Sequence, residues 1–275
     1  MKRKSWPLTS TAALLYLFLY APIAVVIAYS FNNARFGIGW KGFTLDWYHA
    51  IFENQQALAA LKNTLLLGVI STTVAAILGT ALAFGLARSN FRGKKIALGV
   101  LYLPVFVPDI VMAVALLTFY ALVRQWLGIF QLGLGTMILA HVTFQIPFVA
   151  IVVRSRLAGL DPALEEAARD LGANERQTFF HVTLPLAWPG ILAGAMLAFT
   201  LSMDDFVVSF FTSGPGSTTL PILIYSSVKR GITPDINALS TLIVLVSIAI
   251  TVSISLLQQS HHRKARQVLS SEQLR

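Results

Sequence analysis

Three aspartates stand in stretches of the sequence that are otherwise apolar. Asp109 follows the run "LYLPVFVP", and the adjacent pair Asp204 and Asp205 follows "AGAMLAFTLSM". A carboxylate at the centre of a bilayer costs about 2.5–3.5 kcal/mol on insertion scales, so it normally faces a cavity or a partner of opposite charge. The same segments contain no Lys or Arg. The three acids are therefore candidates for a cation pathway, with pairing to Lys or Arg of a second subunit as the alternative.

On a helix, the two adjacent acids would have different neighbouring side chains. Residues three, four and seven apart share a helical face. On one continuous helix, Asp205 shares its face with Ser202 and Ser209, whereas Asp204 shares its face with Leu201. We therefore expect Asp205 to be the main pathway residue and Asp204 to be a secondary or structural carboxylate. Asp205→Asn should then reduce transport more than Asp204→Asn does.

Two prolines precede the remaining acid, Asp109. Pro104 and Pro108 lack the N–H group that a helix interior needs, and they predict a bend or break just before the aspartate. Broken helices at membrane depth often line binding sites. This position strengthens the interpretation of Asp109 as a pathway residue.

A long polar interval, residues 154–188, separates two apolar segments. Within it, Asp161 suits the N-cap of a helix, Pro162 suits its first position, and Gly172 suits the left-handed residue after its last turn. These signals predict a helix of about ten residues on the surface.

A second short helix is predicted directly after the first. Asn174 followed by Gln177 resembles a capping box, and we expect this helix to end before Leu184-Pro185. In the first helix, Ala167-Ala168 leaves a low face that could enter a groove on another protein. The charged residues that would set its register are Glu165, Glu166 and Arg169. A solvated loop that merely joins two apolar segments is the alternative.

The elements that position these residues are membrane helices. The chain has 275 residues, of which 56% are hydrophobic and 12% are charged, and its mean hydropathy is +0.70. Soluble proteins have about 25% charged residues. We expect an all-α polytopic membrane protein that forms a single domain over residues 1–275. Apolar runs of spanning length predict six transmembrane helices, at about residues 11–31, 64–87, 96–123, 135–153, 189–212 and 236–257.

The basic residues set the orientation of these six spans. With the N-terminus inside, the inner segments carry 15 Lys and Arg residues and the outer segments carry 6. Because Lys and Arg concentrate on the cytoplasmic side of membrane proteins, both termini and the 154–188 loop are expected in the cytoplasm. Placement of the net charge of +9 in short loops beside apolar runs also argues against nucleic acid as a partner.

Small residues at every fourth position mark two spans as sites of close helix contact. The first stripe is Ser71, Ala75, Gly79, Ala83 and Ala87, and the second is Gly190, Gly194, Ala198 and Ser202. The outer segment 43–62 is expected to form one interfacial helix. The chain has no cysteine, and its five histidines, His141 among them, lack metal-ligand spacing, so no metal site is predicted.

The polar interval resembles the "EAA" loop in the transmembrane subunits of bacterial ABC importers. The matching residues are Glu166, Ala167, Ala168, Gly172, Val182, Leu184 and Pro185, with Val182 where the family usually has Ile. The resemblance implies the type I permease fold and a coupling helix that docks into an ATP-binding subunit. The sequence lacks the phosphate-binding G-x-x-x-x-G-K-[ST] pattern. ATP and Mg²⁺ would therefore be bound by a pair of partner ATPase subunits, and this chain would be a non-catalytic subunit without a cofactor.

Residues 202–226 resemble the permease subunits of spermidine/putrescine importers, in particular the second of the two permeases. This resemblance implies a bacterial inner-membrane protein, a homologous second permease subunit and a periplasmic binding protein that delivers a polyamine. Ammonium groups are attracted to carboxylates and to aromatic faces. Trp40, Trp47 and Tyr225 are accordingly candidates for contacts on the outer side, with packing or anchoring at the membrane interface as the alternative for each.

Three other interpretations remain. The substrate could be another small cationic solute. The chain could be a self-sufficient carrier in which one of the aspartates takes up protons, although no repeat relates its two halves. An intramembrane aspartyl protease would need carboxylates on two facing helices that share a proton, and the sequence contains no Gly-x-Gly-Asp-like site.

Overall fold

The computed structural model describes residues 6–34, 39–89, 91–230, 234–245 and 248. Over these residues the regular structure is helical, apart from an isolated bridge between Asn32 and Phe43. The all-α prediction is confirmed. The chain divides into two units, one formed by residues 1–55 and 226–275 and the other by residues 56–225.

The first unit contains α1 (Trp6–Tyr29) and α2 (Asp46–Glu53). Asn32 organises the loop between them, because its side-chain amide donates to the carbonyl oxygen of Gly39 and its Oδ1 accepts from the N–H of Lys41, both at 2.9 Å. The predicted interfacial helix over 43–62 is wrong as a single element. The helix stops at Glu53, and a new one begins at Gln55 after an extended residue.

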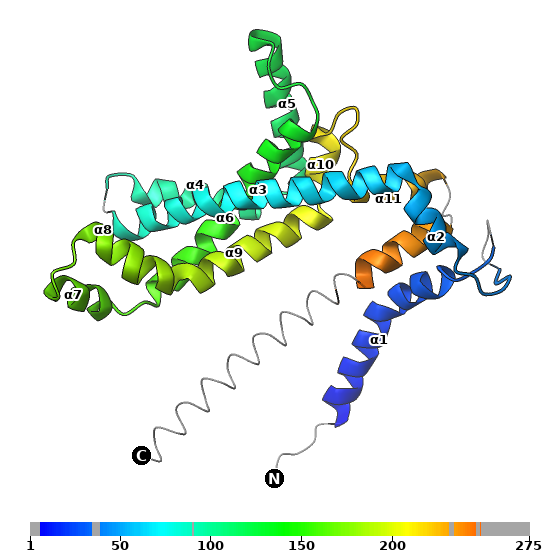
Figure 1. The fold of residues 1–275 in the computed structure, drawn as a ribbon, viewed down its shortest axis with the longest axis horizontal. Helices are drawn as coiled ribbons and strands as arrows, with labels where there is room; N and C mark the ends of the chain where they lie inside the picture. Colours follow the sequence, from blue (N-terminus) through cyan, green and yellow to red (C-terminus); the bar gives the residue numbers. More distant parts are fainter. Residues whose placement is uncertain (1–5, 35–38, 90, 231–233, 246–247, 249–275) are drawn as a thin grey trace. The chain divides into compact units, whose positions relative to one another are not determined.

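The second unit carries most of the helices (Figure 1). They are α3 (Gln55–Arg88), α4 (Lys94–Phe106), α5 (Asp109–Leu127), α6 (Leu134–Ala158), α7 (Ala163–Asp170), α8 (Glu175–Thr178), the π-helical segment η1 (Phe179–Thr183), α9 (Leu184–Asp204) and α10 (Val207–Thr212). The helix α11 (Leu220–Arg230) follows. Within the described residues, five helical stretches are long and apolar enough to cross a membrane. Of the sixth predicted span, 236–257, a helix is described up to Leu245, and most of the remainder lies outside the described residues.

Two predicted spans are not continuous helices. The third is divided, as the prolines predict, because α4 ends at Phe106 and α5 begins after Pro108, which has extended backbone (φ −57°, ψ 137°). The fifth, predicted over 189–212, is also divided. Its helix α9 ends at Asp204, and Asp205 is extended (φ −65°, ψ 120°) before α10 begins. No proline marks this second break, so the helical periodicity alone gave no sign of it.

We expected the second short cytoplasmic helix to end before Leu184-Pro185, and this prediction is wrong. The helix continues through η1 into α9, and the N–H of Leu184 bonds to the carbonyl oxygen of Phe179, five residues earlier. A π-helical turn leaves room where a proline ring would collide with the carbonyl group four residues before it. Pro185 then occupies the first turn of α9, a position that proline tolerates.

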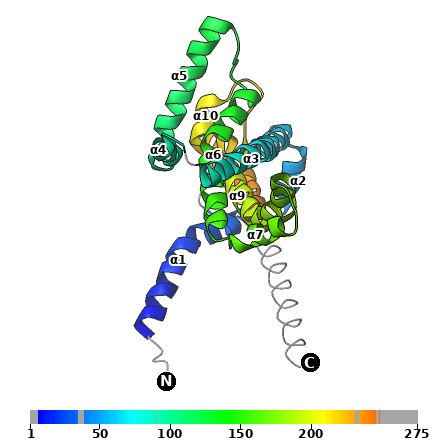
Figure 2. The ribbon, with the colours of Figure 1, turned by 90° about the vertical axis from the view of Figure 1, so that its left-hand side faces the viewer.

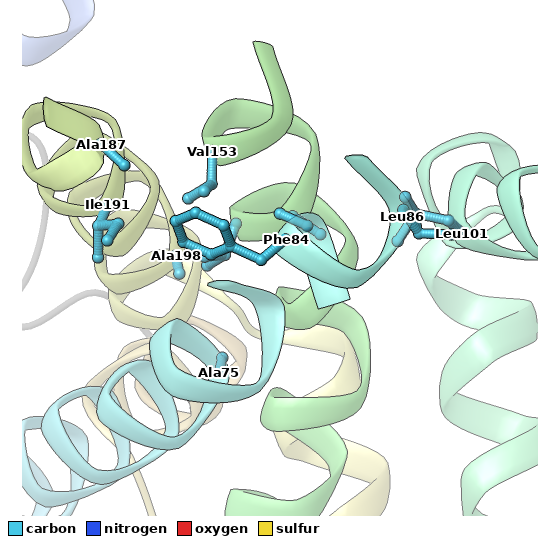
Figure 3. Packing of buried hydrophobic residues seen from close by; sticks show 11 residues of the cluster. Ala75, Phe84, Leu86, Leu101, Val153, Ala187, Ile191 and Ala198 are labelled. Atoms are coloured by element: carbon cyan, nitrogen blue, oxygen red, sulfur yellow. The ribbon is translucent and has the colours of Figure 1, made fainter. Parts of the chain in front are cut away.

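The core of the second unit is built where α3, α6 and α9 run side by side (Figures 1 and 2). Val149 of α6 lies between the two small-residue stripes. A Cβ atom on Gly79 would come within 2.8 Å of the Val149 Cβ, and one on Gly194 would come within 3.3 Å of the Val149 Cα. Apolar residues such as Phe84 and Ile191 complete this core (Figure 3). Both stripes are confirmed as contact faces, except that Ala87 is exposed.

Candidate functional site

The two helix breaks each carry acidic residues. Asp109 is the first residue of α5, and Asp204 and Asp205 stand at the end of α9. α5 and α10 pack against each other through a cluster that includes Ala113 and Val208. Asp204 lies close enough to Asp205 and Asp109 for their negative charges to act on it. Breaks that are about a hundred residues apart in sequence therefore bring three carboxylates into one region.

Asp205 is held by the first turn of the next helix. Its carboxylate accepts from the N–H of Ser209 at 2.7 Å and from the N–H of Val208 at 3.2 Å. These N–H groups have no partner inside a helix, and a carboxylate at this place also favours the helix dipole. Asp205 thus caps α10 and stabilises the break that precedes it.

His141 of α6 completes the surroundings of Asp205. The ring is fully buried, with Nδ1 2.8 Å from the hydroxyl of Ser202 and Nε2 3.0 Å from the hydroxyl of Ser209. Nε2 also lies 3.3 Å from Oδ2 of Asp205. Ser202 and Ser209 are therefore neighbours of Asp205, as predicted, but through His141 and the helix break rather than along one continuous helix.

Accessibility distinguishes the two adjacent acids. The Asp205 side chain is 10% exposed, whereas Asp204 and Asp109 are exposed. The prediction that Asp205 is the main pathway residue requires an unbroken helix, and the helix is broken at this residue. Asp204 and Asp109 present carboxylates that a cation could reach, while the Asp205 carboxylate is engaged by α6 and α10.

Aromatic rings lie next to the break. Phe206 directly follows Asp205, and its ring centroid is 4.4 Å from that of Tyr225 and 5.3 Å from that of Phe210. The predicted residue Tyr225 therefore packs against Phe206, the residue that directly follows the two adjacent acids. Its contact with a substrate stays a prediction.

The other two predicted aromatic residues belong to the first unit. The Trp47 indole N–H donates to the carbonyl oxygen of Asn32 at 2.9 Å, which ties α2 to the loop before it. Trp40 is 56% exposed. A substrate role for either residue stays a prediction.

The predicted surface helix is α7, and its ends follow the predicted signals. The Asp161 carboxylate accepts from the N–H of Ala163 at 3.0 Å, and Gly172 has the left-handed backbone (φ +86°) that ends the helix. The capping box of Asn174 and Gln177 is also confirmed, with both reciprocal hydrogen bonds at 2.9 Å.

Glu165 faces inward from α7. It bonds to the guanidinium of Arg88, at the end of α3, and accepts from the hydroxyl of Thr183 in η1 at 2.6 Å. Its second oxygen lies 3.6 Å from the guanidinium of Arg169. The Thr183 hydrogen bond lowers the pKa of the Glu165 carboxyl; burial opposes this effect, and the positive charges of Arg88 and Arg169 lower the pKa further.

The opposite face of α7 is open. Glu166 and Ala167 are exposed, Ala168 is half-buried, and Leu171 just beyond the helix is 90% exposed. Of the motif residues that follow, Leu184 packs against the core. An exposed helix with short side chains and an exposed leucine is a surface that suits a groove on another protein.

Comparison with known proteins identifies the family. Residues 75–267 match the family described as "Binding-protein-dependent transport system inner membrane component". The chain belongs to this family. It is a multi-pass membrane protein and an inner membrane component of a binding-protein-dependent transport system.

This inner membrane component has similar curated relatives. It is 44% identical over 243 residues to "Spermidine/putrescine transport system permease protein PotC" of Escherichia coli (strain K12), which covers 88% of this chain and 90% of that protein. It is 42% identical over 230 residues to "Putrescine transport system permease protein PotI" of the same organism, which covers 83% and 82%.

Solved structures share the fold. A chain of a bacterial ABC transporter involved in the import of the acidic polysaccharide alginate matches with a TM-score of 0.73 at 21% identity, covering 94% of this chain and 96% of that chain. The expected type I permease architecture is therefore confirmed.

Sequence reasoning missed His141, Arg88 and Thr183. The spacing of His141 argues against a metal ligand, but another signal is present: Gln145 stands four residues later on the same apolar helix. Two buried polar side chains on one face of a membrane helix predict hydrogen bonds to a neighbouring helix. Gln145 indeed donates to the carbonyl oxygen of Ala198 at 3.0 Å.

Proposed function

We propose that the chain is the permease subunit of an ATP-driven importer and that it translocates polyamines across the bacterial inner membrane. The observation that carries this proposal is the group of carboxylates at two helix breaks, with aromatic rings beside one of them. A linear polyamine carries several ammonium groups, which carboxylates neutralise and aromatic faces attract. The names of the relatives PotC and PotI agree with this chemistry.

The three acids have different parts in this proposal. Asp204 and Asp109 are exposed and would take the ammonium groups of the substrate directly. Asp205 would keep the α9–α10 break in place through its bonds to α10 and its contact with His141. Tyr225, with Trp40 and Trp47 as further candidates, would contact the apolar and cationic parts of the substrate.

Energy comes from partner subunits in this proposal. The chain has no phosphate-binding loop of its own, so ATP and Mg²⁺ would be bound by two ATP-binding cassette subunits. The outward face of α7, around Glu166 and Ala167, would dock into them. A homologous permease subunit would complete the pathway, and a periplasmic binding protein would deliver the polyamine. Both termini would lie in the cytoplasm.

The substrate is tested in the assembled complex with its binding protein, in liposomes. Spermidine and putrescine should each stimulate ATP hydrolysis and accumulate inside, whereas a neutral sugar of similar size should do neither. Stimulation by a different cation alone would contradict the polyamine assignment. Uptake by this chain alone without ATP would instead favour a self-sufficient carrier.

The docking role is tested separately with Gly172→Pro and Glu166→Lys. Gly172→Pro removes the left-handed turn that ends α7, because proline is confined to negative φ. Glu166→Lys reverses a charge on the exposed face. Each variant should hydrolyse ATP without matching uptake while the subunit remains inserted. Unchanged transport in both variants would refute docking through this helix.

A further inference from the structure

α7 is attached to the bundle by few contacts. None of its residues is buried, and, within the described residues, its side-chain hydrogen bonds to other elements run through Glu165. A pocket lies beside the helix and is lined by Leu164 and Glu165 of α7 together with side chains from the ends of α3, α6 and α9. Apolar packing therefore does not fix α7 firmly to these spans, and the polar contacts of Glu165 become the main attachment.

Glu165 meets two membrane elements at one point. Its Oε1 binds both the Arg88 guanidinium and the Thr183 hydroxyl, and the same guanidinium donates to Thr183 Oγ1 at 3.0 Å. Thr183 is 2% exposed. Each of the three side chains therefore contacts the other two, and we call this group the Arg88–Glu165–Thr183 clamp.

Aromatic contacts hold the cationic member of the clamp in position. The Arg88 guanidinium carbon lies 5.7 Å from the centroid of the Phe179 ring, within the range of a cation–π contact. Phe84, one turn earlier in α3, packs edge-on against the same ring, with the centroids 5.0 Å apart. The end of α3 and the segment η1 are thus joined by side-chain contacts that do not involve α7.

We propose that the Arg88–Glu165–Thr183 clamp is the joint that transmits movement of α7 to the membrane helices. This inference rests on the proposed docking of α7 to an ATPase. An isolated exposed ion pair contributes little, but this one includes a buried hydroxyl and a guanidinium held over a ring. Arg88 and Thr183 are then positioning residues for coupling, although neither needs to touch the ATPase or the substrate.

The clamp is connected to the acidic region by one helix. α9 begins directly after Thr183 and ends at Asp204 after 21 residues, which is about 30 Å of helix at 1.5 Å per residue. Close packing of Gly194 and Gly79 against Val149 ties α9 and α3 to α6. Because packed helices move as rigid bodies rather than deform continuously, a displacement imposed at the clamp shifts the end that carries Asp204.

Charge exchange provides the test. Arg88→Glu, Glu165→Arg and the double variant Arg88→Glu/Glu165→Arg are assembled with the partner subunits and the binding protein in liposomes. We measure polyamine taken up per ATP hydrolysed, together with co-purification of all subunits. Each single variant should lower this ratio about fivefold or more, the lower end of typical couplings between sites, and the double variant should restore most of it. Arg92→Glu reverses a nearby exposed cation outside the clamp and should keep the wild-type ratio.

Each outcome of the exchange decides the proposal. Single variants that couple normally would overturn it, and so would a double variant as defective as the single ones. Should charge reversal prevent assembly, Glu165→Gln and Thr183→Val add no charge and must still lower the ratio. A wild-type complex that shows no ATP-driven uptake would refute the proposed function instead, which keeps the two failures distinct.

Discussion

At the scale of single residues, adjacent acids can do different work. Asp204 and Asp205 are neighbours in sequence, yet one is exposed and the other is bonded to two N–H groups and lies beside a buried histidine. A carboxylate whose hydrogen-bonding capacity is already used by the protein gains less from a passing cation than one that is open. The structure therefore separates a substrate-facing acid from a structural acid.

We expect Asp204→Asn to raise the KM for the substrate and Asp205→Asn to lower the stability of the subunit. Loss of one ion pair with an ammonium group should raise the KM for spermidine about tenfold, equivalent to about 1.4 kcal/mol. Loss of the Asp205 charge should destabilise the break by about 1–3 kcal/mol, and the melting temperature of the purified complex should fall. A lower melting temperature for Asp204→Asn, with KM changed only in Asp205→Asn, would show the reverse division of roles.

His141→Ala provides a second test at this scale. His141 bonds to Ser202 and Ser209 and lies 3.3 Å from Asp205, so its loss should act on the same break. In a double-mutant cycle, the destabilisation by His141→Ala and Asp205→Asn should be non-additive by about 0.5 kcal/mol or more, as is usual for residues in contact. The matched cycle with Asp204→Asn should be additive. Additivity in both cycles would show that His141 and Asp205 do not interact energetically.

The pH dependence of the clamp also follows from one residue. The pKa of Glu165 is lower in the folded chain than in the unfolded chain. Its contribution to stability is therefore fully present above the unfolded value of about 4.3 and is lost as pH falls through the folded pKa. The melting temperature difference between the wild type and Glu165→Gln should be constant from neutral pH down to about pH 5 and shrink in stronger acid. A difference that grows on acidification would contradict the assigned contacts.

At the scale of elements, local signals predicted more than distant contacts did. Asp161 and Gly172 mark the ends of α7 because capping depends on residues a few positions apart. The break at Asp205 and the π-helical turn at η1 could not be predicted in this way. At both places the structure adds contacts between residues far apart in sequence: His141 of α6 lies beside Asp205, and Phe84 of α3 packs against Phe179 in η1.

The glycine stripe offers a matched pair of variants on one helix. A Cβ atom on Gly79 would meet the Val149 Cβ at 2.8 Å and the Ile146 carbonyl oxygen at 2.9 Å, whereas one on Gly85 would meet nothing within 4 Å. Gly79→Val should push α3 away from α6 and destabilise the subunit by about 1–3 kcal/mol. Gly85→Ala should be neutral or stabilising by up to about 1 kcal/mol, since alanine favours helices. Thermal unfolding in detergent measures both, and equal effects would argue against close packing at Gly79.

At the scale of the whole molecule, the proposals depend on which side of the membrane each segment faces. The acidic residues lie at one end of α9, and the clamp lies at the other. The excess of basic residues predicts that the clamp end is cytoplasmic. Only that orientation lets an ATPase inside the cell reach α7 while the outer ends of the helices receive substrate.

The orientation can be measured directly because the chain contains no cysteine. Glu53→Cys, at the end of α2, and Glu175→Cys, at the start of α8, replace exposed residues on the two predicted sides. In right-side-out spheroplasts, a membrane-impermeant maleimide should label Glu53→Cys at once and Glu175→Cys only after permeabilisation. The cysteine-free wild type sets the background. The opposite pattern would place α7 outside the cell, where no ATP-hydrolysing subunit could hold it, and both the docking of α7 and the clamp would then fail together.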